Sequence, residues 1–283
     1  MNQLEDIIEE LDIGTLLSTR TISGGSINDS FRVETTEGEF FLKLNSASRL
    51  PNMFEAEKRG LELLGQSSFI VPKPLGVGTH GDTQFILMQW VEKGAPEDGF
   101  WNEFGRSLAE LHLLSSVNFG LNHDNYIGSL NQKNSEHENW ADFYRDERLI
   151  PQMNLADKQG RLSQRMRVGF ETLFLELESL FPVEKPSLLH GDLWSGNMMV
   201  TADGSPSIFD PAVYFGHREM DLAMMALFGG FGNGWIDAYN EVYPLESGWR
   251  ERIPIGQLYP LMVHVNLFGG GYVTDVLHAL KQF

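Results

Sequence analysis

Three side chains that could move a proton and bind a metal ion lie around one short stretch of the sequence. Asp192 and Asn197 are five positions apart, and Asp210 follows 13 positions after Asn197, beyond a strand-like run and a turn. Phosphoryl transfer uses such a set, because one carboxylate accepts the proton of the attacking hydroxyl while an amide and a second carboxylate hold Mg²⁺ on the phosphates. The spacing therefore predicts Asp192 as the proton acceptor, and Asn197 and Asp210 as metal ligands.

A glycine-rich turn early in the chain is a candidate for contact with phosphates. It precedes β-rich runs at 30–35 and 39–44, which predict an antiparallel hairpin. A glycine pair near strands is usually only a turn, but backbone amides at such a turn could cover the phosphates of ATP. We expect these contacts from Gly24, Gly25 and Ser26.

Lys43 and Glu57 are predicted to form an ion pair. A strand lysine usually faces solvent, but Glu57 falls on the apolar face of a helix predicted between Pro51 and Gly65. A carboxylate buried there without a partner would be strongly unfavourable. We therefore expect Lys43 to pair with Glu57 and to reach the α- and β-phosphates of a nucleotide, whereas Glu55 falls on the solvated face of the same helix.

The change from strand to helix patterns predicts two lobes. The last strand-like run, Gln84–Val91, leads into a stretch with glycine and proline, beyond which the pattern is mostly helical. We expect an N-terminal ATP-binding lobe over 1–90 and a C-terminal catalytic and substrate lobe over 91–283. This arrangement resembles a kinase-like fold, in which the backbone where the strand meets the linker binds adenine, and the resemblance implies contacts from Met88, Gln89 and Trp90.

Composition limits the partners of the chain. It has 21 Lys and Arg against 39 Asp and Glu, for a formal charge of −18, and this disfavours nucleic acid and anionic membranes. The absence of cysteine excludes disulfides, thiolate catalysis and cysteine-ligated metals. The N-terminus is acidic and the apolar stretches are short or interrupted, so we expect a cytoplasmic, monomeric protein without a membrane segment.

Longer motifs around the same residues resemble a known family. His190-Gly191-Asp192 with Asn197 is similar to the loop of aminoglycoside phosphotransferase-like kinases. Longer sequence motifs resemble those of the fructosamine kinase (ketosamine 3-kinase) family. These motifs lie at residues 190–197, 209–212, 216–219, 221–223 and 266–271. Further matching segments at 41–45, 53–57, 71–74 and 125–128 extend the resemblance over nearly the whole chain.

The resemblance implies a fold, cofactors and a substrate. The fold is α+β and protein-kinase-like, with an antiparallel sheet and a helix in the N-terminal lobe, a mainly helical C-terminal lobe, and ATP and Mg²⁺ between them. The acceptor is a hydroxyl of a ketosamine of the fructosamine or ribulosamine type, free or carried on an amine or lysine. In the family the 3-phosphate product decomposes and frees the amine, which reverses glycation.

Two other functions stay open at this point. Another small-molecule kinase of the same fold could act on an aminoglycoside, choline or a homoserine-like alcohol, because fold does not fix substrate. A nucleotide-binding scaffold without activity is disfavoured, because no member of the predicted catalytic set is missing. Candidate linings for a sugar pocket are aromatic or polar, and they are Trp194, Tyr214, His217, Arg218, Trp235, Trp249 and Asn266.

Overall fold

An antiparallel sheet forms the N-terminal part of the structure, a computed structural model that describes residues 3–23 and 27–283. Gly24, Gly25 and Ser26, which we expected near phosphates, lie outside the described residues. Within the described residues this sheet has five strands in the order β1-β2-β3-β5-β4. The strands are β1 (Leu16–Thr21), β2 (Asp29–Thr35), β3 (Gly38–Ser46), β4 (Pro74–His80) and β5 (Thr83–Gln89).

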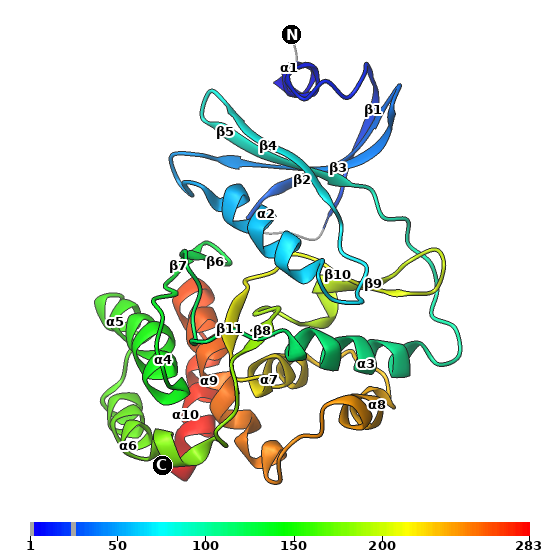
Figure 1. Cartoon of the computed structure of the whole chain (residues 1–283). Coiled ribbons are helices and arrows are strands. Elements are labelled where there is room, and N and C mark those ends of the chain that lie inside the picture. The colour runs from blue at the N-terminus through cyan, green and yellow to red at the C-terminus, as the bar shows by residue number, and fades with distance from the viewer. Residues whose placement is uncertain (1–2, 24–26) are drawn as a thin grey trace.

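A helix covers each face of this sheet. Side chains alternate along the strands, so apolar residues project from both faces and both are buried by a helix. On one face α1 (Gln3–Glu10) packs with Leu42 of β3 and Leu87 of β5. On the other face α2 (Met53–Leu64) packs with Ile86 and Met88 of β5. Lys43 follows Leu42 and is therefore directed to the face that α2 covers. Figure 1 shows α1 at one end of the molecule and α2 between the sheet and the helical part.

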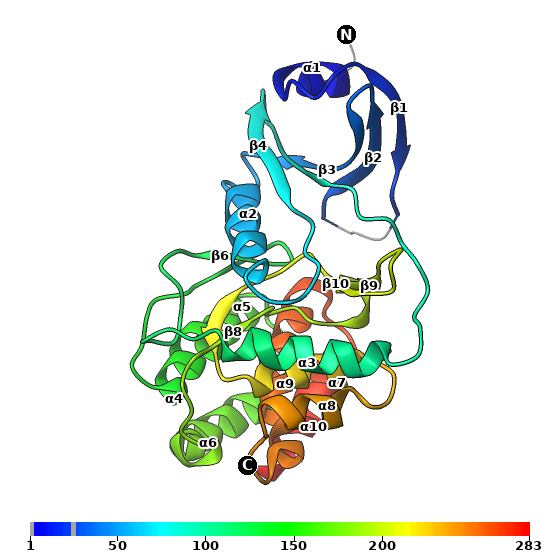
Figure 2. The same cartoon turned by 45° about the vertical axis from the view of Figure 1, so that its right-hand side comes forward.

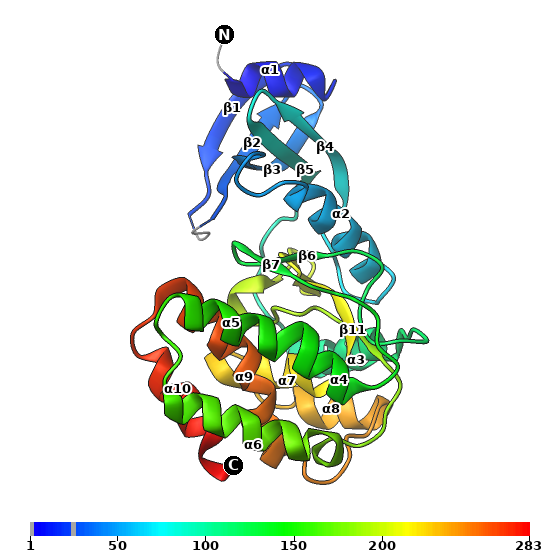
Figure 3. The same cartoon turned by 90° about the vertical axis from the view of Figure 1, so that its left-hand side faces the viewer.

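A linker leads from β5 to α3 (Phe100–Leu113), and beyond it the chain is mainly helical. The remaining helices are α4 (Trp140–Phe143), a π-helix (Tyr144–Leu149), α5 (Ile150–Lys158), α6 (Gln164–Leu180), α7 (Glu219–Phe228), α8 (Trp235–Val242), α9 (Trp249–Phe268), α10 (Tyr272–Ala279) and two 3₁₀ turns at Ser195–Asn197 and Leu280–Gln282. The helix α9 lies against α7 and α10 (Figure 3). The described residues contain no helix long and apolar enough to cross a membrane.

Helical spacing of apolar residues extends over Leu155–Phe181 and would predict one helix there, but the structure has a break within this range. The chain turns between α5 and α6, where Gly160 has φ +68°, a value that glycine adopts readily. Ser163 then caps the new helix, because its hydroxyl accepts a hydrogen bond of 3.2 Å from the backbone N–H of Met166. A glycine and a serine cap therefore end a pattern that periodicity alone makes continuous.

Short strand pairs hold the loops at the centre of the molecule. They are β6 (Asn125–Ile127) with β7 (Leu130–Gln132), β8 (Ser187–Leu189) with β11 (Tyr214–Gly216), and β9 (Met198–Val200) with β10 (Pro206–Ile208). The β9–β10 hairpin bonds to the linker, because Gly94 N–H donates to Val200 O at 2.9 Å and Ala202 N–H donates to Glu92 O at 2.9 Å. Figure 2 shows the linker passing beside this hairpin.

Candidate active site

The loop between β8 and β9 is tied down by a buried carboxylate. Asp221, in the first turn of α7, accepts hydrogen bonds from the backbone N–H of His190 at 2.7 Å and of Gly191 at 2.9 Å. The same carboxylate lies 3.3 Å from His112 Nε2. Asp221 therefore fixes the backbone of the two residues that precede Asp192.

Gly191 brings this loop against the segment that follows Asp210. Its φ is +82°, and a Cβ at this position would lie 2.0 Å from the carbonyl oxygen of Ala212. No side chain fits at that distance from the backbone, so only glycine allows the two segments to approach. Ala212 N–H in turn donates to His190 O at 2.9 Å, which closes the contact.

His190 orders the loop as a neutral imidazole. Its Nδ1 accepts from the Asp192 N–H at 3.2 Å, so the proton resides on Nε2, which donates to Phe209 O at 2.9 Å. Burial lowers the pKa of His190 and keeps the ring uncharged. Both ring nitrogens are used in backbone contacts, so His190 is a structural residue of the loop.

Asp192, Asn197 and Asp210 converge on one place. The Nδ2 of Asn197 donates to Asp192 O at 2.9 Å, to Asp192 Oδ2 at 3.1 Å and, weakly, to Asp210 O at 3.4 Å. Within the described part of the chain, no hydrogen bond is donated to the Asn197 Oδ1. Burial, together with the negative charge of Asp210, raises the pKa of Asp192 to about 7, which is near the optimum for a general base at neutral pH.

Lys43 joins the sheet to this loop. It is 3% exposed, and its Nζ lies 2.7 Å from Glu57 Oε1 and also hydrogen-bonds Asp210 Oδ1. Burial alone would lower the pKa of Lys43, but the Asp210 and Glu57 carboxylates outweigh it and raise the pKa, so the ammonium form is kept. The structure thus joins β3, α2 and the segment after β10 through one buried cation.

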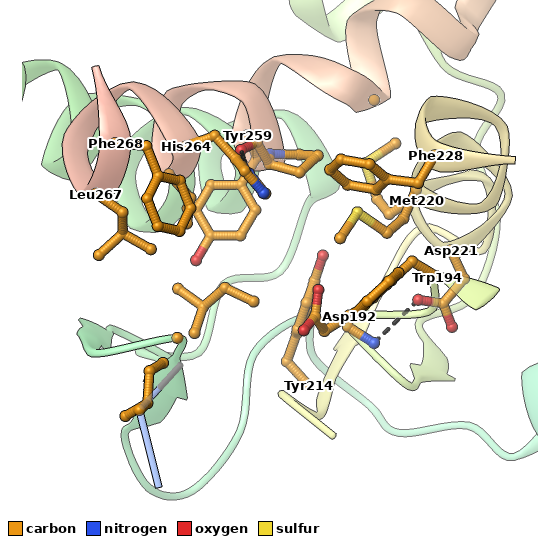
Figure 4. Close-up of a pocket in the computed structure, with 18 residues that line it drawn as sticks. Asp192, Trp194, Tyr214, Met220, Asp221, Phe228, Tyr259, His264, Leu267 and Phe268 are labelled. Atoms are coloured by element: carbon orange, nitrogen blue, oxygen red, sulfur yellow. Dashed lines mark hydrogen bonds between the residues drawn. The ribbon is translucent and has the colours of Figure 1, made fainter. Parts of the chain in front are cut away.

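Two adjoining cavities meet at Asp192. One of about 200 Å³ is polar and charged, and its lining includes Lys43, Glu57, Asn197 and Asp210. The other, of about 250 Å³, is mainly apolar and aromatic, and Figure 4 shows the α9 side chains facing Asp192 and Trp194 across it. Asp192 and Trp194 line both cavities. A phosphate-bearing ligand in the first and an alcohol in the second would therefore meet at the Asp192 carboxylate.

The oxygen atoms present fit a magnesium ion that arrives with a nucleotide. Among the described residues no group of three or more His, Asp or Glu side chains could hold a metal alone. Magnesium is instead usually held by one or two protein carboxylates together with substrate phosphates. Asp210, whose side chain is 43% exposed, and the Oδ1 of Asn197 provide oxygen ligands of this kind beside the charged cavity.

The side chains of the expected adenine-binding residues line neither cavity. Met88 is buried against α2, and Gln89 is exposed while its backbone N–H donates to Lys73 O at 2.9 Å. The Trp90 ring lies under the Arg32 guanidinium, 4.5 Å from its centroid. The backbone N–H of Gln89 is therefore already engaged, so contact with adenine would use other backbone groups of this segment.

Only some of the residues that we expected from the sequence to line a sugar pocket lie around the second cavity. Trp194 and Tyr214 line it. The other five residues that we proposed do not, because their side chains face the core or other partners. His217 and Arg218 surround Glu184, Trp235 and Trp249 pack against the core beside α3, and Asn266 bonds to Gln152.

The helix α9 supplies a wall of this cavity that the sequence pattern does not single out. Its members repeat every four residues along that helix, and they are Tyr259, Pro260, Val263, His264, Leu267 and Phe268. Phe228 at the end of α7 completes the wall. The repeat is visible in the sequence, but an i, i+4 stripe on an apolar helix usually marks core packing, so the pattern alone did not single it out.

His264 gives this wall a polar atom. Its Nδ1 donates to Pro260 O at 2.7 Å, so Nε2 carries the lone pair of the neutral ring. Burial lowers the pKa of His264, which favours this uncharged form. The second cavity therefore combines aromatic surface with a hydrogen-bond acceptor on the side opposite Asp192.

Comparison with known proteins identifies relatives over the whole length of the chain. The family model described as fructosamine kinase matches residues 4–283. A probable ketoamine kinase of Enterococcus faecium is 39% identical over 96% of this chain and 100% of its own length. The chloroplastic protein-ribulosamine 3-kinase of Arabidopsis thaliana is 38% identical over 93% of this chain and 81% of its own length.

Solved structures agree with these matches. A candidate fructosamine-3-kinase from Thermobifida fusca superimposes with a TM-score of 0.90 at 36% identity, covering 99% of this chain and 98% of that one. An aminoglycoside phosphotransferase, APH(4)-Ia, in complex with AMP-PNP and hygromycin B superimposes over the whole of both chains with a TM-score of 0.68 at 15% identity. At that identity the likeness concerns the fold alone, and it confirms the predicted protein-kinase-like α+β architecture.

Proposed function

The chain belongs to the fructosamine kinase family and is an ATP-dependent kinase, and we propose that it phosphorylates a sugar hydroxyl of a ketosamine and thereby promotes deglycation of the attached amine. The observation that carries this proposal is the position of Asp192 at the border of a charged cavity and an aromatic one. Such a border suits the transfer of a phosphoryl group from a nucleotide to an alcohol.

The charged cavity is the proposed site of the ATP phosphates. Lys43, kept cationic by Asp210 and Glu57, would bind the α- and β-phosphates. Asn197 Oδ1 and Asp210 would hold Mg²⁺, which when bound neutralises the charge of the phosphates. We also propose the division into an N-terminal ATP-binding lobe over 1–90 and a C-terminal catalytic and substrate lobe over 91–283, with adenine bound by the backbone at Met88, Gln89 and Trp90.

The aromatic cavity is the proposed acceptor site. A sugar hydroxyl there would donate its proton to Asp192, whose raised pKa places it near neutrality. Asn197 Nδ2 holds the Asp192 carboxylate in place through its contact with Oδ2. Trp194, Phe228 and Phe268 are 37%, 39% and 59% exposed, so the cavity opens at the surface. An open mouth accommodates a ketosamine that is attached to a larger amine or to a lysine side chain.

A panel of acceptors tests this function. The purified protein with Mg²⁺ and ATP should phosphorylate ribulosamine or fructosamine derivatives of lysine, and should leave kanamycin and choline unmodified, as followed by mass spectrometry. Transfer to kanamycin or choline alone would keep the fold and overturn the substrate. ATP binding without transfer to any acceptor would instead identify a scaffold.

The pair Glu57→Gln and Glu55→Gln provides a matched control. Both residues lie on α2, but Glu57 bonds to Lys43 whereas Glu55 is exposed on the opposite face. We expect Glu57→Gln to lower phosphate transfer strongly and Glu55→Gln to leave it unchanged. Monomeric state and cytoplasmic location stay predictions, which light scattering and cell fractionation would test.

A further inference from the structure

A group of buried amide side chains lies behind Asp210 and outside the catalytic set. We call Asn125, Gln132 and Asn134 the amide cluster, and they are 5%, 1% and 0% exposed. Asn125 Oδ1 accepts from Gln132 Nε2 at 2.8 Å and from Asn134 Nδ2 at 3.0 Å. The three side chains therefore form one connected network, contributed by the β6–β7 hairpin and the residue segment just after it.

The amide cluster holds the backbone that follows Asp210. Gln132 Nε2 donates to Ala212 O at 3.0 Å, and Asn125 Nδ2 donates to Val213 O at 2.8 Å. These carbonyl groups belong to the second and third residues after Asp210. Two side-chain donors from a distant hairpin thus fix the chain direction immediately beyond the carboxylate.

Asp210 needs such support, because its own backbone is strained. Its φ is +56°, in the left-handed region that residues other than glycine rarely adopt. A conformation of this kind persists only when the surrounding structure determines it. Pro211 follows directly and has no N–H to contribute a further bond. The bonds to Ala212 and Val213 therefore help to hold Asp210 in this conformation, together with the bonds that Lys43 and Asn197 make to Asp210 itself.

Aromatic and cationic groups keep the amide cluster itself in place. Tyr259 OH donates to Gln132 Oε1 at 2.7 Å. Arg148, which is fully buried in the π-helix, donates to Asn134 Oδ1 at 2.7 Å, and its guanidinium lies 4.0 Å from the centroid of the Tyr214 ring. π-Helical turns are rare and are often found at functional sites. The donors of Gln132 and Asn125 are thus held in one orientation, toward the chain after Asp210.

We propose that Gln132 and Asn125 are positioning residues that set the metal-binding geometry of Asp210. This inference rests on the proposed role of Asp210 as a metal ligand. Groups that orient a ligand from behind typically change metal affinity by roughly 10- to 100-fold when they are removed. Loss of the Gln132 donor would free the Ala212 carbonyl, relax the left-handed Asp210 and weaken the binding of the metal–nucleotide complex.

Binding of Mn²⁺ with ADP measures this effect without turnover. Free Mn²⁺ is followed by electron paramagnetic resonance while the protein is titrated in the presence of ADP. Gln132→Met removes both donated bonds and nearly keeps the volume, and we expect it to weaken Mn²⁺·ADP binding by roughly tenfold or more. Gln132→Leu also removes both donated bonds with a shorter, uncharged side chain, so it decides the result if Gln132→Met does not fold.

Gln152→Met is the matched control. Gln152 is also a buried glutamine of the helical part, 4% exposed, and it bonds to Asn266 on α9 instead of to the Asp210 segment. We expect a comparable loss of stability in urea but Mn²⁺·ADP affinity within about twofold of the wild type, because only the Gln132 variants alter the metal site. A loss of affinity in Gln152→Met as large as in the Gln132 variants would reduce the effect to general destabilisation and overturn the proposal.

Asp210→Asn separates this inference from the function on which it rests. If Asp210→Asn weakens Mn²⁺·ADP binding and the folded Gln132 variants do not, the positioning role is wrong while the metal-binding role of Asp210 stands. If Asp210→Asn binds Mn²⁺·ADP like the wild type, both assignments are wrong. Phosphate transfer to a ketosamine does not enter either comparison.

Discussion

Replacing Asp221 by asparagine tests whether this residue supports the catalytic loop or only caps a helix. The Asp221 carboxylate accepts two backbone hydrogen bonds, of 2.7 and 2.9 Å, from His190 and Gly191, and it is 1% exposed. Asparagine has one oxygen and can accept only one of them. The second N–H would then face an NH₂ group and remain unpaired in the interior.

The structure sets the size of the expected effect. A hydrogen bond to a charged acceptor contributes about 1.5–3 kcal/mol, and a buried donor left unpaired costs about 1–3 kcal/mol. We therefore expect Asp221→Asn to lower the free energy of unfolding by about 2–3 kcal/mol. With a urea dependence of about 2–3 kcal/mol per molar, the midpoint should shift by about 1 M. Phosphate transfer should fall as well, because Asp192 follows the two loosened residues.

Asp237→Asn is the control for this measurement. Asp237 is the third residue of α8 as Asp221 is the third residue of α7, but Asp237 is exposed. Its loss removes only an interaction with the helix dipole, worth about 0.3–1 kcal/mol. Urea unfolding of both variants gives the comparison. Equal midpoints for Asp221→Asn and Asp237→Asn would refute the view that Asp221 holds the loop.

Three further predictions follow from single contacts. Gly191→Ala should abolish phosphate transfer whereas Gly204→Ala should not. Both glycines have φ near +80°, but only a Cβ at Gly191 would meet a backbone oxygen, at 2.0 Å. Equal activities of the two variants in steady-state assays would contradict this. Phe268→Ala should raise the KM for the ketosamine and leave the KM for ATP unchanged, and a change in the ATP value would place this ring elsewhere. Burial lowers the pKa of His217 to about 4, from 6.5 in the unfolded chain. The unfolded chain therefore binds the proton first, and the free energy of unfolding falls by about 3 kcal/mol as the pH drops from 6.5 to 4. Unfolding free energies of the wild type and of His217→Gln, measured across this range, should show a difference that changes with pH.

Much of the charged cavity could be predicted from sequence, because its members lie on local elements with clear patterns. Lys43 falls at an alternating strand position and Glu57 on the apolar side of a helix bounded by Pro51 and Gly65. Asp192, Asn197 and Asp210 are joined by one loop and one hairpin, so their spacing already limits how far apart they can lie. Local geometry is therefore sufficient to bring these groups together.

The aromatic cavity could not be predicted in the same way, because its wall depends on how distant helices pack. Tyr259 and His264 face Asp192 across this cavity only because α9 packs against α7. Trp235 and Trp249 are tryptophans like Trp194, and residue type alone does not distinguish them, yet they pack against the core. The network of Asn125 and Gln132 behind Asp210 is likewise invisible in sequence, since 80 or more positions separate donor and acceptor.

The central claim is that Asp192 accepts the proton of a ketosamine hydroxyl beside bound ATP. The most direct measurement is ³¹P and ¹H NMR of the product formed from Mg·ATP and the fructosamine or ribulosamine derivative of lysine, with the wild type and with Asp192→Asn. We predict a phosphate monoester on the sugar carbon C3 with the wild type, and a rate lower by roughly 10²- to 10⁴-fold with Asp192→Asn. Phosphorylation at the wild-type rate by Asp192→Asn, or no sugar phosphate with the wild type, would contradict the account.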